Sequence, residues 1–174
     1  MYAKLHSFGL LGMDAFPVEV EADLSQGLPA FDIVGLPDAS VKESRDRVRA
    51  ALKNLKFTYP VSRITINLAP ADVKKAGPLY DLPILLSILL ASEQVKGDFQ
   101  NSAFLGELSL TGEIRPVSGV LPMVIAAKER GLGSVFLPLQ NGQEASIVQG
   151  VTLYGVRHIH ELLDHFPARS LSPL

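Results

Sequence analysis

Five basic residues near the middle of the first half of the chain are spaced so that a helix would place them on one side. They follow one another at steps of three and four residues, which bring side chains onto the same helix face. A row of cations of this kind can follow the phosphates of a nucleic-acid backbone. We call these residues the basic stripe: Lys42, Arg45, Arg49, Lys53 and Lys56.

The same charges have a plainer interpretation as a solvated helix face that is held by ion pairs. Glu43 lies four residues before Arg47, and Asp46 lies three residues before Arg49. Pairs at these spacings stabilise helices without binding any ligand. Both interpretations stay open at this point, and DNA is the candidate partner of the first.

A second candidate is the segment 70–81, which leads from an expected strand into an apolar helix. A Gly77-Pro78 start leaves backbone N–H groups facing outward, where they can hold an anion or an oxyanion. Lys74 and Lys75 would add positive charge as a loop contact. The alternative is an ordinary helix-entry loop. Leu79 follows this start and cannot act as a nucleophile.

Most catalytic signatures are missing from the chain. It has no cysteine, no phosphate-binding Gly-x-x-x-x-Gly-Lys-Ser/Thr loop and no Gly-x-Ser-x-Gly elbow. Three of its histidines gather near the C-terminus, but their spacing matches no established set of metal ligands. We therefore predict no bound metal and no cofactor for this chain. The four histidines are His6, His158, His160 and His165.

Composition describes a soluble folding domain. The 174 residues are 47% apolar and 20% charged, and the net charge is −2, so any affinity for nucleic acid must come from a local patch. The N-terminus lacks the pattern of a signal peptide. The most apolar stretch, 82–91, is far shorter than the about 20 residues that cross a bilayer. We expect a cytoplasmic protein without membrane contact.

Strand-like and helix-like segments alternate along the chain, which predicts an α/β domain. We expect the first two strands to pair as a hairpin. The expected strands are 17–22, 30–35, 63–68, 102–108, 110–115, 134–137 and 151–156. The expected helices are 39–55, 81–94, 119–130, 141–148 and 159–166. We assign 1–166 to one domain, and 167–174 has the composition of a linker.

The helix expected over 39–55 has the clearest pattern. Asp38 or Ser40 can cap it, and Ser40 with Glu43 fits a capping box. Its core side recurs at three- and four-residue steps. That side comprises Val41, Ser44, Val48, Ala51, Leu52 and Leu55.

Several ordered motifs together resemble the N-terminal region of the ComM/YifB family of magnesium-chelatase-related AAA+ ATPases. The resemblance covers about residues 1–166. It is carried by segments 16–21, 35–52, 66–72, 77–83 and 106–117.

The resemblance implies a ribosomal-protein-S5-domain-2-like α/β fold, similar to the Lon proteolytic domain and the RadA C-terminal domain. It also implies that an ATPase module, which binds ATP and Mg²⁺, follows in the full protein. Family members of the ComM type are described as hexameric DNA helicases that promote branch migration during natural transformation. This chain then corresponds to a domain that joins its own ATPase module in a homo-hexamer.

Similarity to Lon proteases permits a test for peptidase chemistry. Lon proteases use a serine that attacks and a lysine that serves as its base. By motif, those positions fall on Leu79 and Leu121. Leucine supplies neither a nucleophile nor a proton acceptor, so we predict no catalytic residues and no peptidase activity.

Three functions follow as hypotheses. The first is a non-catalytic accessory domain of a DNA-remodelling ATPase that contacts DNA or organises the ring. The second is a protein-docking domain without DNA contact, which the negative net charge favours. The third, suggested only by the family's description, is a part of a metal-chelatase-like motor.

Overall fold

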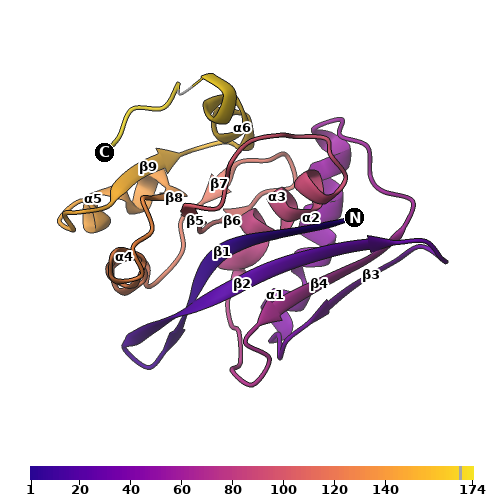
Figure 1. Cartoon of the computed structure of the whole chain (residues 1–174), viewed down its shortest axis with the longest axis horizontal. Coiled ribbons are helices and arrows are strands. Elements are labelled where there is room, and N and C mark those ends of the chain that lie inside the picture. Colours follow the sequence, from indigo (N-terminus) through magenta and orange to yellow (C-terminus); the bar gives the residue numbers. More distant parts are fainter. Residues whose placement is uncertain (169) are drawn as a thin grey trace.

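A mixed seven-stranded sheet forms the centre of the molecule in a computed structural model that describes residues 1–168 and 170–174 (Figure 1). Its strand order is β3-β4-β2-β1-β5-β8-β9, and β6 with β7 forms a separate two-stranded sheet. The strands are β1 Tyr2–Leu11, β2 Asp14–Ser25, β3 Ala30–Val34, β4 Arg63–Ala69, β5 Ser102–Phe104, β6 Glu107–Leu108, β7 Ile114–Arg115, β8 Ser134–Pro138 and β9 Thr152–Val156. The helices are α1 Ala39–Lys42, α2 Ser44–Asn54, α3 Asp81–Ala91, α4 Val120–Glu129, α5 Gly142–Ala145 and α6 Ile159–Ala168, with 3₁₀ turns η1 Pro78–Tyr80 and η2 Leu139–Asn141. The predicted α/β class is confirmed.

Strand β1 lies in the middle of the sheet, although no strand was predicted there. It pairs antiparallel with β2, so that Leu5 opposes Val20, and parallel with β5 on its other side. Leu5 is buried between the polar residues Lys4 and His6, and consecutive apolar residues come only at the end of the strand, over 8–11. The first half of β1 therefore has no apolar pattern that reveals its central place in the sheet.

The predicted hairpin of the first two expected strands is wrong. Strand β3 pairs parallel with β4, and β2 pairs antiparallel with both β1 and β4. Parallel neighbours need a long crossover connection, and α1 with α2 supplies one between β3 and β4. The tight turn between β2 and β3 therefore does not lead these two strands to pair with each other.

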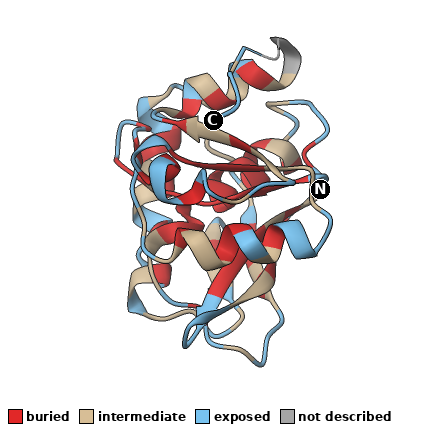
Figure 2. Cartoon of the chain, turned by 90° about the vertical axis from the view of Figure 1, so that its left-hand side faces the viewer, coloured by how far each residue is buried: buried red, intermediate tan, exposed pale blue. Residues whose placement is uncertain are grey.

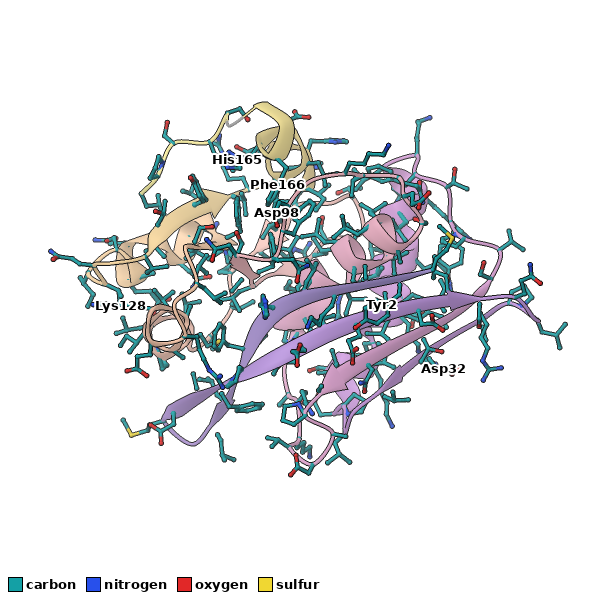
Figure 3. All side chains as sticks on the ribbon, in the orientation of Figure 1. Tyr2, Asp32, Asp98, Lys128, His165 and Phe166 are labelled. Carbon is teal, nitrogen blue, oxygen red and sulfur yellow. The ribbon has the colours of Figure 1, made fainter. Side chains whose placement is uncertain are left out.

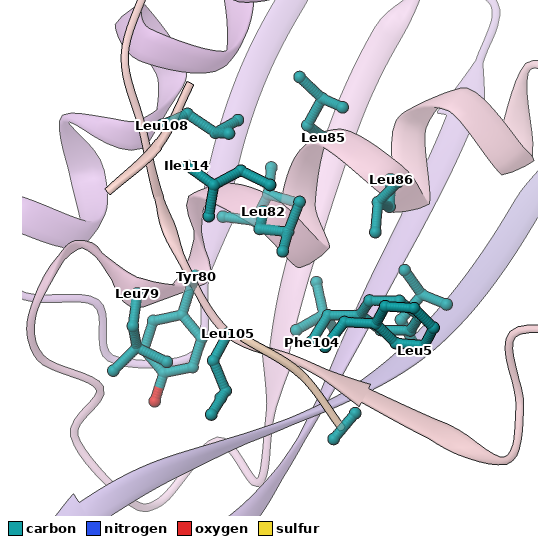
Figure 4. Close-up of a cluster of buried hydrophobic side chains, with 14 of the residues drawn as sticks. Leu5, Leu79, Tyr80, Leu82, Leu85, Leu86, Phe104, Leu105, Leu108 and Ile114 are labelled. Carbon is teal, nitrogen blue, oxygen red and sulfur yellow. The ribbon is translucent and has the colours of Figure 1, made fainter. Parts of the chain in front are cut away.

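Helix α3 is the most buried helix, as its composition predicts, and it packs against β1 and β2. The register places Leu5, Val18 and Val20 on the α3 side of the sheet. Figure 4 shows Leu82, Leu85 and Leu86 of α3 in the same buried cluster as Leu5 of β1. In Figure 2 the buried residues lie along the sheet and the inner sides of the helices, whereas exposed residues lie on turns and outer helix sides. None of the described helices combines the length and the apolarity needed to cross a bilayer.

Several predicted boundaries differ from the observed ones. Helix α3 ends at Ala91 rather than 94, because Glu93 takes a left-handed backbone conformation with φ of 59°. The strand expected over 102–108 divides into β5 and β6, and the one expected over 110–115 is only β7. The helix expected over 141–148 is η2 followed by the short α5.

The end of the chain lies against the domain. The Leu174 backbone N–H donates to the carbonyl of Leu153 on β9 at 2.8 Å, and the Leu171 N–H donates to Nδ1 of His165 at 3.1 Å. Helix α6 also continues past residue 166, and residue 169 lies outside the described residues. The domain boundary at 166 and the linker at 167–174 stay predictions.

Candidate nucleic-acid interface

The helix that carries the basic stripe begins at a capped residue and is interrupted by one turn. The Asp38 carboxylate accepts from the Val41 N–H at 2.8 Å, whereas Ser40 donates to that carboxylate, so the Ser40–Glu43 capping box does not form. A turn at Glu43 divides the expected helix into α1 and α2. The predicted core side is buried at five of its six positions, and Leu55 is half-buried.

Opposite that core side, the basic stripe faces solvent. Lys42, Arg45, Lys53 and Lys56 are exposed, and Arg49 is half-buried. Lys56 follows the helix in a left-handed conformation with φ of 64°. The cations therefore occupy one exposed side that runs from α1 to the turn after α2.

An aromatic ring supports the middle of the stripe. The Arg49 guanidinium lies 5.8 Å and the Lys53 ammonium 5.5 Å from the centre of the Tyr59 ring. Arg49 Nε also donates to the Tyr59 hydroxyl at 3.5 Å, and this bond raises the pKa of Arg49. Cations held on a ring face lose less freedom when they meet an anion.

Both ion pairs expected from helix spacing are present. Arg47 lies 3.9 Å from Glu43, and Arg49 lies 3.8 Å from Asp46. Within the described residues, no carboxylate comes within ion-pair distance of the other four cations of the stripe, Lys42, Arg45, Lys53 and Lys56. The stripe thus keeps most of its charge unpaired.

Arg47 turns away from the surface and binds a buried carboxylate. Its Nε donates to Asp81 Oδ2 at 2.6 Å, and its Nη2 donates to Oδ1 at 3.1 Å. The Ser44 hydroxyl and the Leu108 N–H also donate to Asp81. Burial alone would lower the pKa of Arg47, but the bonds to Asp81 outweigh it and raise that pKa. The sequence pattern did not reveal this network, because Arg47 and Asp81 are far apart in the chain.

The structure separates the two lysines of the 70–81 segment. Lys74 is exposed, whereas Lys75 is buried and donates from Nζ to the carbonyls of Gly35 and Pro70. This burial lowers the pKa of Lys75. The expectation that Lys75 is a surface contact is therefore wrong, since its ammonium ties two loops together inside the protein.

The start at Gly77-Pro78 lies beside an apolar hollow of about 320 Å³. The hollow is lined by Leu10, residues 76–79 and residues 116–118. None of these residues is titratable, and Leu79 is buried among core side chains (Figure 4). The Gly77 N–H already donates to Asp38 Oδ2 at 3.3 Å. Leu121 is half-buried on α4 and does not line the hollow.

The histidines do not converge. His158 and His160 stack at 4.9 Å near the start of α6, and the His158 ring contacts the Thr111 carbonyl. His165 is buried against Phe136 and Tyr154. Across the described residues, no group of three or more potential ligands is arranged to hold a metal ion.

This fold, a mixed sheet with a buried α3 that follows a Gly-Pro turn, defines a Lon-like α/β domain. The sequence pattern of subunit ChlI of Mg-chelatase matches residues 20–141. The chain therefore belongs to the magnesium-chelatase-related ChlI family.

Named relatives agree with this assignment. The chain is 40% identical to competence protein ComM of Haemophilus influenzae over 99% of its length, which is 34% of that protein. It is 42% identical to YifB of Escherichia coli K12 over 84% of its length, which is 29% of that protein. A more distant peroxisomal Lon protease homolog 2 of rice (Oryza sativa subsp. japonica) is 31% identical over 84% of the chain and 18% of that protein. The chain thus spans about a third of the length of ComM and YifB.

Proposed function

We propose that this chain is a non-catalytic accessory domain of a longer ComM/YifB-like ATPase, and that it corresponds to the N-terminal part. The support is the match of nearly the whole chain to about a third of ComM. In this proposal the remaining part of the longer protein binds ATP and Mg²⁺ and forms the hexamer. The leucines at positions 79 and 121 support a role without peptide-bond chemistry.

The basic stripe is the DNA contact in this proposal. The observation that carries it is the row of cations from α1 to the turn after α2, of which the four exposed ones have no ion-pair partner in the described part of the chain. Their spacing along one helix side suits the sequence-independent tracking of phosphates. A role in branch migration requires such contact, because a migrating junction moves over every sequence.

The experiment is a titration of the chain with fluorescent single-stranded, duplex and four-way-junction DNA across a salt series. We expect binding that weakens as salt rises, with a slope that reports the number of phosphate contacts. The triple reversal Arg45→Glu, Arg49→Glu and Lys53→Glu is expected to abolish it. A preference for junctions would assign branch recognition to this domain.

The matched control reverses three other exposed cations, Lys96, Arg115 and Arg130, to glutamate. These lie outside the stripe, and the net charge changes by the same amount. Equal loss of binding in both triple variants would show a general charge effect and would remove the assigned role from the stripe. No binding at low salt would place DNA contact elsewhere in the longer protein.

A protein-docking domain without DNA contact is the second candidate. The net charge of −2 and several large exposed apolar side chains, such as Leu11 and Met13, favour it. Failure of DNA binding in the titration above would favour this candidate. A role in a metal-chelatase motor rests on the family description alone.

A further inference from the structure

An apolar surface covers the turn between β1 and β2 and the outer side of α4. Leu11 and Met13 in the turn are 68% and 92% exposed, Ile125 on α4 is 41% exposed, and Ile147 after α5 is 71% exposed. Figure 1 shows the β1–β2 turn, α4 and α5 on the same side of the molecule. Exposed apolar side chains that gather in this way mark an interaction surface.

This surface contains two hollows, one on each side of Ile125. One of about 330 Å³ lies between the β1–β2 turn and α4 and is lined by Met13, Asp14 and Pro122 among others. The other, of about 480 Å³, lies between α4 and the segment 147–149. Ile125 and Glu129 line both hollows. The projecting Met13 and the second hollow therefore lie on opposite sides of Ile125.

The charges at the two positions are opposite in sign. Asp14 follows Met13 and is exposed, and Lys128 lies on the rim of the second hollow. Figure 3 shows Lys128 on the outer side of α4. Neither residue has an ion-pair partner among the described residues. A second copy that brought Met13 to the hollow would bring Asp14 towards Lys128.

We propose that this surface binds a second copy of the same chain across a two-fold axis beside Ile125. Met13 of each copy enters the hollow between α4 and residues 147–149 of the other, and Asp14 of each copy pairs with Lys128 of the other. A two-fold contact requires this reciprocity, because each copy presents the same patch. The surface combines apolar side chains with the charged groups of Asp14, Lys128 and Glu129.

This contact goes beyond the proposed function and does not depend on it. The basic stripe lies on α1 and α2, outside the residues that form the contact. A reciprocal two-fold pair also differs from the head-to-tail contact that closes a ring. The pair is therefore separate from the hexamer expected of the longer protein.

Sedimentation equilibrium of the purified chain over a range up to about 0.5 mM, above the micromolar Kd typical of weak complexes, tests the proposal. We expect a monomer–dimer equilibrium. Asp14→Lys and Lys128→Asp are each expected to raise the dimer Kd about tenfold or more, because each places like charges together at both ends of the contact. The double variant with both substitutions is expected to restore the Kd to within about threefold, since the pair is only reversed.

A matched control separates this contact from general stickiness. Met13→Asp is expected to abolish the dimer, whereas Leu28→Asp, in the 86% exposed position of the β2–β3 turn, is expected to leave it unchanged. Circular dichroism checks that each variant is folded. A chain that stays monomeric, an assembly larger than a dimer, or a double charge reversal without recovery would each overturn the proposal.

Discussion

The guanidinium of Arg47 on α2 binds the carboxylate of Asp81 at the start of α3, with Nε 2.6 Å from Oδ2. Asp81 is fully buried, and the Arg47 side chain is only 20% exposed. With Ser44 and the Leu108 N–H, the carboxylate accepts four hydrogen bonds. The network joins α2, α3 and β6, so the helix that carries the basic stripe is fixed to the core by one of its own cations.

Removal of Arg47 should destabilise the protein strongly. Arg47→Ala leaves a buried carboxylate without its counter-charge, and loss of one partner of a buried pair costs about 3–5 kcal/mol. Urea unfolding measures the change in the free energy of unfolding. Arg157→Ala is the control, because Arg157 is 72% exposed and pairs with Glu161 at 3.4 Å. That exposed pair is expected to contribute less than about 1 kcal/mol. Equal effects of the two substitutions would contradict the structural role of Arg47.

Gly35 is expected to tolerate no side chain. Its φ is 107°, and a Cβ there would lie 2.2 Å from the backbone carbonyl oxygen of Leu68 on β4. Gly35→Ala must therefore move β4 as well as strain the backbone, and we expect a loss of about 3 kcal/mol or more. Gly12→Ala serves as the comparison, since φ there is 65° and no atom lies within 4 Å. For Gly12→Ala we expect urea unfolding to show a loss of only about 1–2 kcal/mol in the free energy of unfolding, which is the cost of a left-handed alanine.

The hydroxyl of Tyr2 should titrate at unusually high pH. Its hydrogen bond to Glu21, at 2.5 Å, raises the pKa of Tyr2 from 10.0 to about 12. The folded protein therefore retains a proton that the unfolded chain loses. The stabilisation is complete below pH 10 and is lost as the pH rises towards 12.

NMR of ¹³C-labelled tyrosine measures this pKa directly. Glu21→Gln is expected to move it most of the way back towards 10, because the main cause is removed. Glu19→Gln is expected to move it slightly, since Glu19 acts only through its charge. A pKa of 10 for Tyr2 in the unsubstituted protein would contradict the hydrogen bond between Tyr2 and Glu21.

The chain should not cleave unfolded protein. The hollow beside Gly77 contains one hydroxyl, on Ser118, and no titratable group that could serve as its base. We expect fluorescein-labelled casein to release no more label than in buffer, with or without Ser118→Ala. Cleavage that is lost in Ser118→Ala would identify Ser118 as a nucleophile and would contradict the prediction.

Local patterns predicted some features well. The three- and four-residue recurrence from Val41 to Leu52 predicted both the buried side of α2 and the opposite basic side. The apolar composition of 82–91 predicted the most buried helix. These features depend on helix geometry, which the spacing of residues along the chain expresses directly.

Long-range partners were not predictable in this way. The pairing of β3 with β4 rather than β2 depends on which strand lies beside it, and β1 is central only because β2 and β5 flank it. The inward turn of Arg47 and the burial of Lys75 likewise depend on residues that are distant in sequence.

The sequence by itself therefore determined the class of fold and the side of the helix that carries the cations. Only the tertiary structure decided which cations remain at the surface. Lys75 and Arg47 have the same formal charge as the residues of the basic stripe, but they meet carbonyls or a buried carboxylate inside the protein. The reason is that a charge leaves water only where the fold supplies partners for it, and those partners come from other parts of the chain.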